Sequence, residues 1–281
     1  LEADGIVGPR TLRSLNIPVD KRIGQLRLSL ERARWVLDGI EDNVVVVNIA
    51  GFRAYVVSGR EISWETRVVV GKPHQQTPVF RDELQYIVFN PSWTVPYSIA
   101  TREMLPQLKA DSTYFASRAF DIRDKEGNFV DPANVDWEQV TRRNFAYSFI
   151  QRPGPDNALG QIKFMFPNEH AVYLHDTPSR ELFGLAERAF SHGCIRVADP
   201  LHLAELLLRN DGWDRKRIDD AVQSGKTRTV YLSKRMPILV LYWTASVDPD
   251  GLVHFHDDVY QRDPAIAQAL DAPFSIGRAP N

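Results

Sequence analysis

A single cysteine, Cys194, lies in a segment whose residue types suit nucleophilic catalysis. The segment reads Ser-His-Gly-Cys-Ile-Arg-Val at 191–197, and another histidine, His175, lies upstream in Tyr-Leu-His-Asp. A thiolate can attack a carbonyl carbon while a nearby imidazole accepts the thiol proton. Gly193 lets the backbone turn tightly, so that neighbouring N–H groups can face a developing oxyanion. A lone cysteine is commonly a small buried apolar residue, but His, Gly and Arg beside it favour catalysis.

Two histidines could serve as the base for Cys194. His175 is the first candidate, and His192 is the second because residues two apart on extended chain point to the same side. A group that orients the imidazole is also expected. Asp176 could do this with its side chain, or a backbone carbonyl could serve and leave no trace in the sequence.

His175, followed after fifteen residues by Ser-His-Gly-Cys-Ile-Arg, resembles the signature of YkuD-type L,D-transpeptidases. The resemblance implies that Cys194 is the nucleophile and His175 the base. It also implies that the backbone of His192, Gly193 and Cys194 forms the oxyanion hole. Members often have an asparagine a few residues after the cysteine, whereas this chain has Arg-Val-Ala-Asp at 196–199, so no role is assigned to an asparagine.

Four residues are expected to contact substrate. The forked guanidinium of Arg196 could bind a carboxylate, although an ion pair with Asp199 is an equally good interpretation. Tyr173 and Trp93 could line the cleft, although aromatic side chains more often belong to the core. Ser191, which opens the cysteine motif, completes the set.

The sequence patterns predict strands and helices that would position these residues. Together they indicate an α+β protein with a mainly β catalytic domain. Residues 21–38 form an amphipathic helix on which Ile23 and Leu30 belong to the apolar stripe. Period-two patterns and turn residues predict strands at 44–49, 53–58, 61–70, 84–90, 161–166, 171–175, 228–232, 238–247 and 252–255. Helices are predicted at 101–110, 113–119, 136–143, 178–189 and from Asp199-Pro200 onward.

The organisation into domains rests on two further segments. The β pattern lapses over about 97–155, which predicts a helical insertion resembling the capping subdomain of the longer YcbB-like branch. Such an insertion could act as a lid or be a passive decoration. Residues 1–18 resemble the end of a peptidoglycan-binding domain, and 19–42 form a connecting helix. The catalytic domain then covers 43–281.

Composition excludes several classes of function. The 281 residues carry a net charge of −2, which gives no sign of nucleic-acid binding. No apolar run is long enough to span a membrane. His254 and His256 share one face of a predicted strand, but no third ligand is evident, so no metal site is predicted there. No cofactor is predicted, because a thiol and hydrogen-bond donors supply the proposed chemistry. One cysteine cannot form an internal disulfide. An unpaired thiol in an exported protein would need an explanation, and catalysis provides one.

The resemblance implies acyl transfer on peptidoglycan stem peptides in the periplasm or cell envelope, with any signal peptide outside this fragment. Cys194 would attack the third stem residue, and a neighbouring stem amine would complete a 3→3 crosslink. It also implies that carbapenems acylate Cys194. The alternatives are an L,D-carboxypeptidase, a papain-like peptidase with a histidine after the cysteine, and a non-catalytic wall-binding protein.

Overall fold

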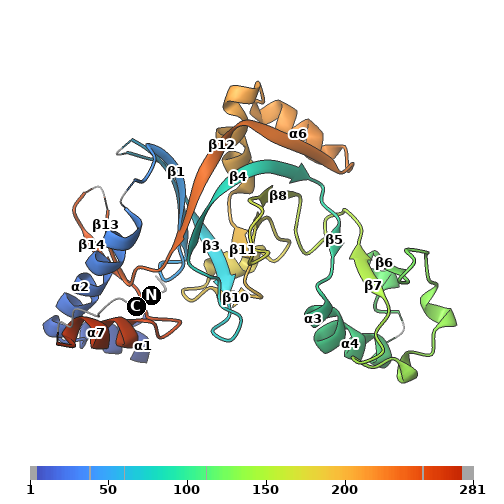
Figure 1. Ribbon diagram of the computed structural model, residues 1–281, viewed down its shortest axis with the longest axis horizontal. Helices are drawn as coiled ribbons and strands as arrows, with labels where there is room; N and C mark the ends of the chain where they lie inside the picture. Colours follow the sequence, from blue (N-terminus) through green and yellow to red (C-terminus); the bar gives the residue numbers. More distant parts are fainter. Residues whose placement is uncertain (1–4, 38, 60, 112, 249, 274–281) are drawn as a thin grey trace, which may run out of the picture. The chain divides into compact units, whose positions relative to one another are not determined.

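The computed structural model describes residues 5–37, 39–59, 61–111, 113–248 and 250–273, and its strands and helices form two compact units (Figure 1). The first unit comprises Leu1–Glu83, Glu181–Ile195 and Met236–Asn281, and the second comprises Leu84–Arg180 and Arg196–Arg235. Strands and helices occur in both units. The predicted α+β class is confirmed.

The first unit is built on a β-meander. Strands β1 (Asn43–Asn48), β2 (Arg53–Ser58) and β3 (Glu61–Gly71) pair in antiparallel succession. Valine-rich strands suit this pleated, half-buried arrangement, and Val45 and Val47 are fully buried. The end of β12 (Arg228–Leu241) runs parallel to β1, and β10 (Ala189–Ser191) runs parallel to the end of β3.

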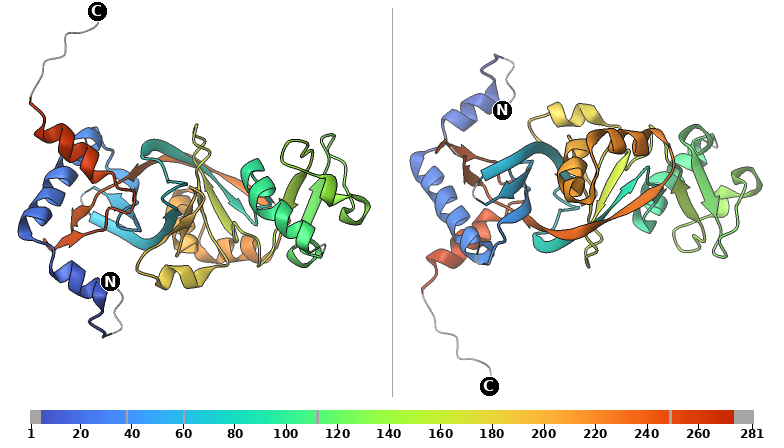
Figure 2. Two further views of the ribbon diagram at one scale, coloured as in Figure 1. Left: turned by 90° about the horizontal axis from the view of Figure 1, so that it is seen from below. Right: turned by 90° about the horizontal axis from the view of Figure 1, so that it is seen from above.

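Helices pack beside this sheet in the first unit. Helix α2 (Val19–Val36) lies next to α7 (Asp263–Asp271) and to β13 (Ala245–Val247) of the β13–β14 hairpin (Figure 2). The remaining elements are α1 (Pro9–Leu15) and β14 (Val253–Phe255). No helix in the described ranges is long and apolar enough to cross a membrane.

The predicted helix at 21–38 is confirmed by α2, and residue 38 lies outside the described residues. The predicted apolar stripe of this helix is wrong in part. Ile23 and Leu30 are exposed, whereas Leu28, Ser29 and Arg32 are buried. Arg32 is buried because its guanidinium pairs with Asp263 at 2.6 Å. An ion pair and a hydroxyl contact therefore replace part of the expected apolar packing.

The second unit contains the strand order β11-β9-β8-β4-β12. These strands include β11 (Ile195–Val197), β9 (Leu174–His175), β8 (Ile162–Met165) and β4 (Phe80–Phe89). Strand β8 pairs antiparallel with β4 and with β9, and Phe89, Ile162, Phe164 and Leu174 are fully buried. Helices α5 (Pro200–Leu208) and α6 (Arg215–Gln223) pack together in the same unit.

Two predicted elements differ from the structure near these strands. Residues 178–189 are not one helix, because only Arg180–Gly184 form a 3₁₀ turn and β10 follows. The Val70 N–H donates to the Arg188 carbonyl, so pairing with β3 draws this backbone into an extended conformation. The two strands predicted at 228–232 and 238–247 are mostly one strand, β12, which continues through Pro237.

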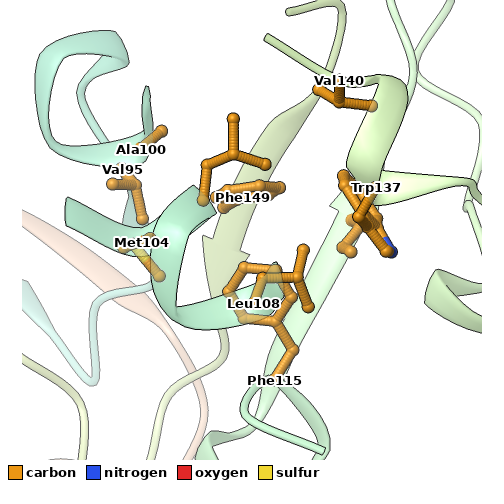
Figure 3. Close-up of a cluster of buried hydrophobic side chains, with 10 residues drawn as sticks. Val95, Ala100, Met104, Leu108, Phe115, Trp137, Val140 and Phe149 are labelled. Carbon is orange, nitrogen blue, oxygen red and sulfur yellow. The ribbon is translucent and has the colours of Figure 1, made fainter. Parts of the chain in front are cut away.

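The insertion has a core of its own (Figure 3). Its helical part is α3 (Tyr97–Ile99), a π-helical turn (Ala100–Met104) and α4 (Leu105–Ala110). A three-stranded sheet follows the order β5 (Trp93–Thr94), β7 (Ser148–Gln151), β6 (Phe120–Arg123). The buried residues are Val95, Ala100, Met104, Leu105, Leu108, Phe115, Ile122, Trp137, Val140 and Phe149.

The insertion is therefore mixed in structure and not wholly helical. The helices predicted at 113–119 and 136–143 shorten to 3₁₀ turns at Ala116–Arg118 and Trp137–Gln139. At the second turn, the carboxylate of Asp136 accepts the Glu138 N–H, which favours a tight local turn over a longer helix. The predicted helix at 101–110 is confirmed.

Candidate active site

Cys194 is half-buried in the loop that joins β10 to β11. The Ser191 hydroxyl closes this loop, because its oxygen accepts the Gly193 N–H at 3.1 Å and its proton goes to the Cys194 carbonyl at 2.5 Å. Gly193 has a φ of 116°, a conformation that side chains disfavour, so glycine is required at this turn. Ser191 is 2 % exposed, and this geometry favours a loop-shaping role over the predicted contact with substrate.

The same hydrogen bond constrains the predicted oxyanion hole. An oxyanion hole needs backbone N–H groups aimed at the developing negative charge. The Gly193 N–H is aimed at Ser191 Oγ instead, so it cannot serve an oxyanion without breaking that bond.

A second loop, residues 71–77, supports the cysteine loop. The Thr77 hydroxyl donates to the Gly193 carbonyl at 2.8 Å, and the Lys72 N–H donates to the Ser191 carbonyl at 2.9 Å. The fully buried Thr77 was not expected from the sequence. The backbone of the cysteine loop is thus held from a distant part of the chain.

His175 is the last residue of β9 and is 4 % exposed. Its Nδ1 lies 2.5 Å from the backbone carbonyl of Asp176. A carbonyl can only accept, so Nδ1 carries the proton and Nε2 holds the lone pair that a base needs. The group in contact with the imidazole is therefore the backbone carbonyl of Asp176 and not its carboxylate.

The Asp176 carboxylate has a different set of partners. It accepts the Gln161 N–H and the Arg180 guanidinium, each at 2.9 Å. Arg180 also donates to the Ala198 carbonyl just after β11. Gly160 leaves room for the carboxylate, because a β-carbon there would lie 2.4 Å from Oδ2. The carboxylate therefore braces the segment from which His175 projects.

The surroundings of His175 keep its imidazole neutral. Burial lowers its pKa from 6.5 to about 3, and the positive charges of Arg196 and Lys163 act in the same direction. The hydrogen bond to the Asp176 carbonyl opposes these effects only in part. A neutral imidazole can accept a proton from a thiol.

Tyr173 and Lys163 lie beside His175 in the second unit. The Tyr173 ring packs edge-on against the imidazole, with centroids 5.6 Å apart, and Lys163 Nζ lies 3.8 Å from the Tyr173 ring centroid. Lys163 is directly opposite His175 in the β8–β9 register. The sequence did not single out Lys163, because the register of two predicted strands is not visible in either strand alone.

Trp93 and the two histidines at 254 and 256 have other partners. Trp93 lies in β5, just before the insertion, and its ring packs 6.3 Å from that of Phe120 within the insertion. His254 Nε2 lies 2.8 Å from Asp248 Oδ2, and His256 Nε2 lies 3.1 Å from Ser246 Oγ. Within the described part of the chain, no three His, Cys, Asp or Glu side chains gather in a group that could hold a metal.

The sequence of this chain is similar to those of known proteins. The sequence profile of the YkuD family, described as the L,D-transpeptidase catalytic domain, matches residues 42–230. A Haemophilus influenzae protein named "Putative L,D-transpeptidase" is 35 % identical over 259 residues, which cover 90 % of this chain and 52 % of that protein. This chain therefore spans about half the length of that relative.

Solved structures of L,D-transpeptidases are similar at lower identity. The catalytic domain of an Enterococcus faecium L,D-transpeptidase acylated by ertapenem is 13 % identical, with a TM-score of 0.35, over 72 % of this chain and 99 % of that one. L,D-transpeptidase 3 from Mycobacterium tuberculosis, in complex with a faropenem-derived adduct, is 14 % identical, with a TM-score of 0.29. That match covers 71 % of this chain and 60 % of the other.

Proposed function

Because the chain belongs to the YkuD family of L,D-transpeptidase catalytic domains, we propose that Cys194 and His175 are its nucleophile and general base. The strand order is the observation that carries this proposal. Cys194 immediately precedes β11, and β11 neighbours β9, whose last residue is His175. A neutral imidazole with its proton on Nδ1 is the form that this role requires.

The proposed reaction proceeds through a thioester. His175 Nε2 accepts the thiol proton, and Cys194 Sγ attacks the carbonyl carbon of the third residue of a tetrapeptide stem. The electron pair of the C=O bond moves to oxygen and returns as the bond to D-Ala breaks. The departing amine takes the proton from His175, which leaves an acyl-enzyme.

The second half of the reaction releases the acyl group. A side-chain amine of a neighbouring stem attacks the thioester, and Cys194 leaves as a thiolate that recovers the proton. The product is a 3→3 crosslink. If water attacks in place of the amine, the same site is an L,D-carboxypeptidase.

The proposal extends to location and inhibition. A substrate in the cell wall places the reaction outside the cytoplasm, in the periplasm or cell envelope. Carbapenems should acylate Cys194, because their β-lactam ring presents a carbonyl that a thiolate can attack. The strained β-lactam carbonyl would take the place of the stem carbonyl.

The test is incubation with purified tetrapeptide stems, followed by mass analysis of the products. We expect a crosslinked dimer and free D-Ala, and neither should form with Cys194→Ala. A tripeptide without dimer would identify hydrolysis as the reaction. No turnover by the wild-type protein would leave a wall-binding protein as the better account.

The same assay identifies the base. His175→Ala should lose far more activity than His192→Ala, because His175 has the buried, oriented imidazole. If His192→Ala is the more damaging change, His192 is the base and the proposed pair is wrong.

A further inference from the structure

A chain of buried hydroxyl groups links the C-terminal part of the first unit to the cysteine loop. The Tyr260 hydroxyl donates to the Gly71 carbonyl at 2.6 Å and accepts the Thr77 N–H at 3.2 Å. The Thr77 hydroxyl accepts the Gly71 N–H at 2.9 Å and donates to the Gly193 carbonyl at 2.8 Å. Thr77 is fully buried and Tyr260 is 5 % exposed, so water does not compete for these bonds.

The direction of each bond is fixed by the number of protons available. A hydroxyl has one proton, and a backbone N–H can only donate. Since Thr77 Oγ1 already accepts from Gly71, its own proton is left for the Gly193 carbonyl. The Tyr260 proton likewise goes to the Gly71 carbonyl, because its oxygen accepts the Thr77 N–H. The network therefore has one arrangement of protons and not two.

Holding the Gly193 carbonyl also fixes the N–H of Cys194. In a trans peptide, the C=O of one residue and the N–H of the next point in opposite directions. Gly193 has a φ of 116° and no side chain, so nothing within the residue itself resists rotation of this peptide. The bond from Thr77 supplies that resistance and directs the Cys194 N–H to the side opposite Thr77.

We propose that Thr77 and Tyr260 are positioning residues that aim the Cys194 N–H at the oxyanion formed during acyl transfer. The inference rests on the proposed function, in which that N–H is an oxyanion donor. Neither residue touches the substrate. Thr77 acts through the Gly193 carbonyl, and Tyr260 acts by holding both the N–H of Thr77 and the carbonyl of Gly71.

Tyr260 is itself held firmly. Its N–H donates to the Tyr242 hydroxyl at 2.9 Å, and the two rings stack with centroids 5.6 Å apart. The Tyr242 hydroxyl donates to Asp258 at 2.6 Å. The Arg262 guanidinium lies over both rings and donates to Gln76 in the supporting loop at 2.8 Å. The segment 258–262 thus serves the active site from a region that the catalytic motif does not include.

The experiment compares two reactions of Cys194 in the full chain. p-Nitrophenyl acetate acetylates the thiol through a tetrahedral oxyanion and releases p-nitrophenolate. Iodoacetamide alkylates the same thiol by displacing iodide, and no oxyanion forms. Both rates are measured by mass spectrometry of the Cys194 peptide, with Cys194→Ala as the background.

The variants are Thr77→Val, which keeps the shape and removes the hydroxyl, and Tyr260→Phe, which keeps the stacked ring. Loss of a whole oxyanion donor lowers kcat by about 100- to 1,000-fold. We therefore expect a misdirected donor to slow acetylation by about 10- to 100-fold, while the rate of alkylation changes by less than about threefold. Thr77→Ser keeps the hydroxyl and should restore acetylation. Ser29→Ala is the control, because it removes a buried hydroxyl that accepts the Ala245 N–H elsewhere in the unit.

The outcomes separate this inference from the proposed function. If acetylation and alkylation fall together, or if neither falls, Thr77 and Tyr260 do not position the oxyanion donor. A selective loss in Ser29→Ala as well would show a general effect of destabilisation and would overturn the inference. If acetylation behaves as expected but tetrapeptides are not turned over, the proposed function fails and the positioning role stands.

Discussion

Acid should destabilise this protein through His175, and His175→Gln should remove that effect. In the folded chain His175 has a pKa of about 3 against an ordinary value of 6.5. The fold therefore favours the neutral imidazole. This contribution to stability is complete above pH 6.5 and is lost as the pH falls toward 3.

The size of the effect follows from the two pKa values. A shift from 6.5 to about 3 corresponds to about 5 kcal/mol once the pH is below both values, at about 1.4 kcal/mol per unit. Between pH 7 and pH 5 the unfolded chain takes up this proton and the folded chain does not. Because pH 5 lies only about 1.5 pH units below 6.5, the loss is about 2 kcal/mol. Because His175 is 4 % exposed, solvent screening reduces this value little.

The assay is urea unfolding at pH 7 and pH 5, followed by tryptophan fluorescence. His175→Gln has no titrating imidazole, so its free energy of unfolding should fall by about 2 kcal/mol less than that of the wild type over this interval. His74→Gln, which removes an exposed imidazole, is measured beside it as the matched control. An equal loss in His175→Gln and wild type would show that His175 is not held neutral by the fold.

Three further predictions concern the supports of the site. Gly160→Ala should lower the free energy of unfolding by about 1–3 kcal/mol in thermal or urea denaturation, because its β-carbon would lie 2.4 Å from the Asp176 carboxylate; an unchanged stability would contradict this packing. Asp176→Asn should slow acylation less than His175→Ala does, because it keeps the backbone carbonyl that orients the imidazole. The opposite order would give the orienting role to the carboxylate. Replacing about 97–155 by a Gly/Ser linker should leave a folded protein that still reacts with small thiol reagents, because the insertion has its own core. Crosslinking of stems should fall if the insertion is a lid. Failure to fold would make the segment part of the catalytic core, and normal crosslinking would exclude a lid.

Local patterns were sufficient to predict most of the strands. The valine run at 44–47 and the turn at Ser58-Gly59-Arg60 predicted the β-meander, although residue 60 lies outside the described residues. Helix α2 was predicted to within two residues at each end, apart from residue 38. Helices α6 and α7 were not predicted, because each is only nine residues long and so offers little more than two turns of pattern.

Contacts between distant segments could not be predicted from the sequence. Arg32 looked like a surface residue of an amphipathic helix, yet it pairs with Asp263 more than two hundred residues away. Thr77 contacts both Tyr260 and the Gly193 carbonyl of the cysteine loop, although these three segments lie far apart in the sequence. Cys194 and His175 could be proposed as a catalytic pair because the residue types around them suggest chemistry, whereas a supporting hydroxyl resembles any other buried threonine or tyrosine.

The most direct test of the central claim is intact-protein mass spectrometry after incubation with a carbapenem. We expect a single covalent adduct with the mass of the intact drug, which peptide mapping assigns to Cys194 and which Cys194→Ala does not form. An adduct on another residue, or an unmodified wild-type protein at high drug excess, would contradict the role of Cys194 as the acyl-accepting nucleophile.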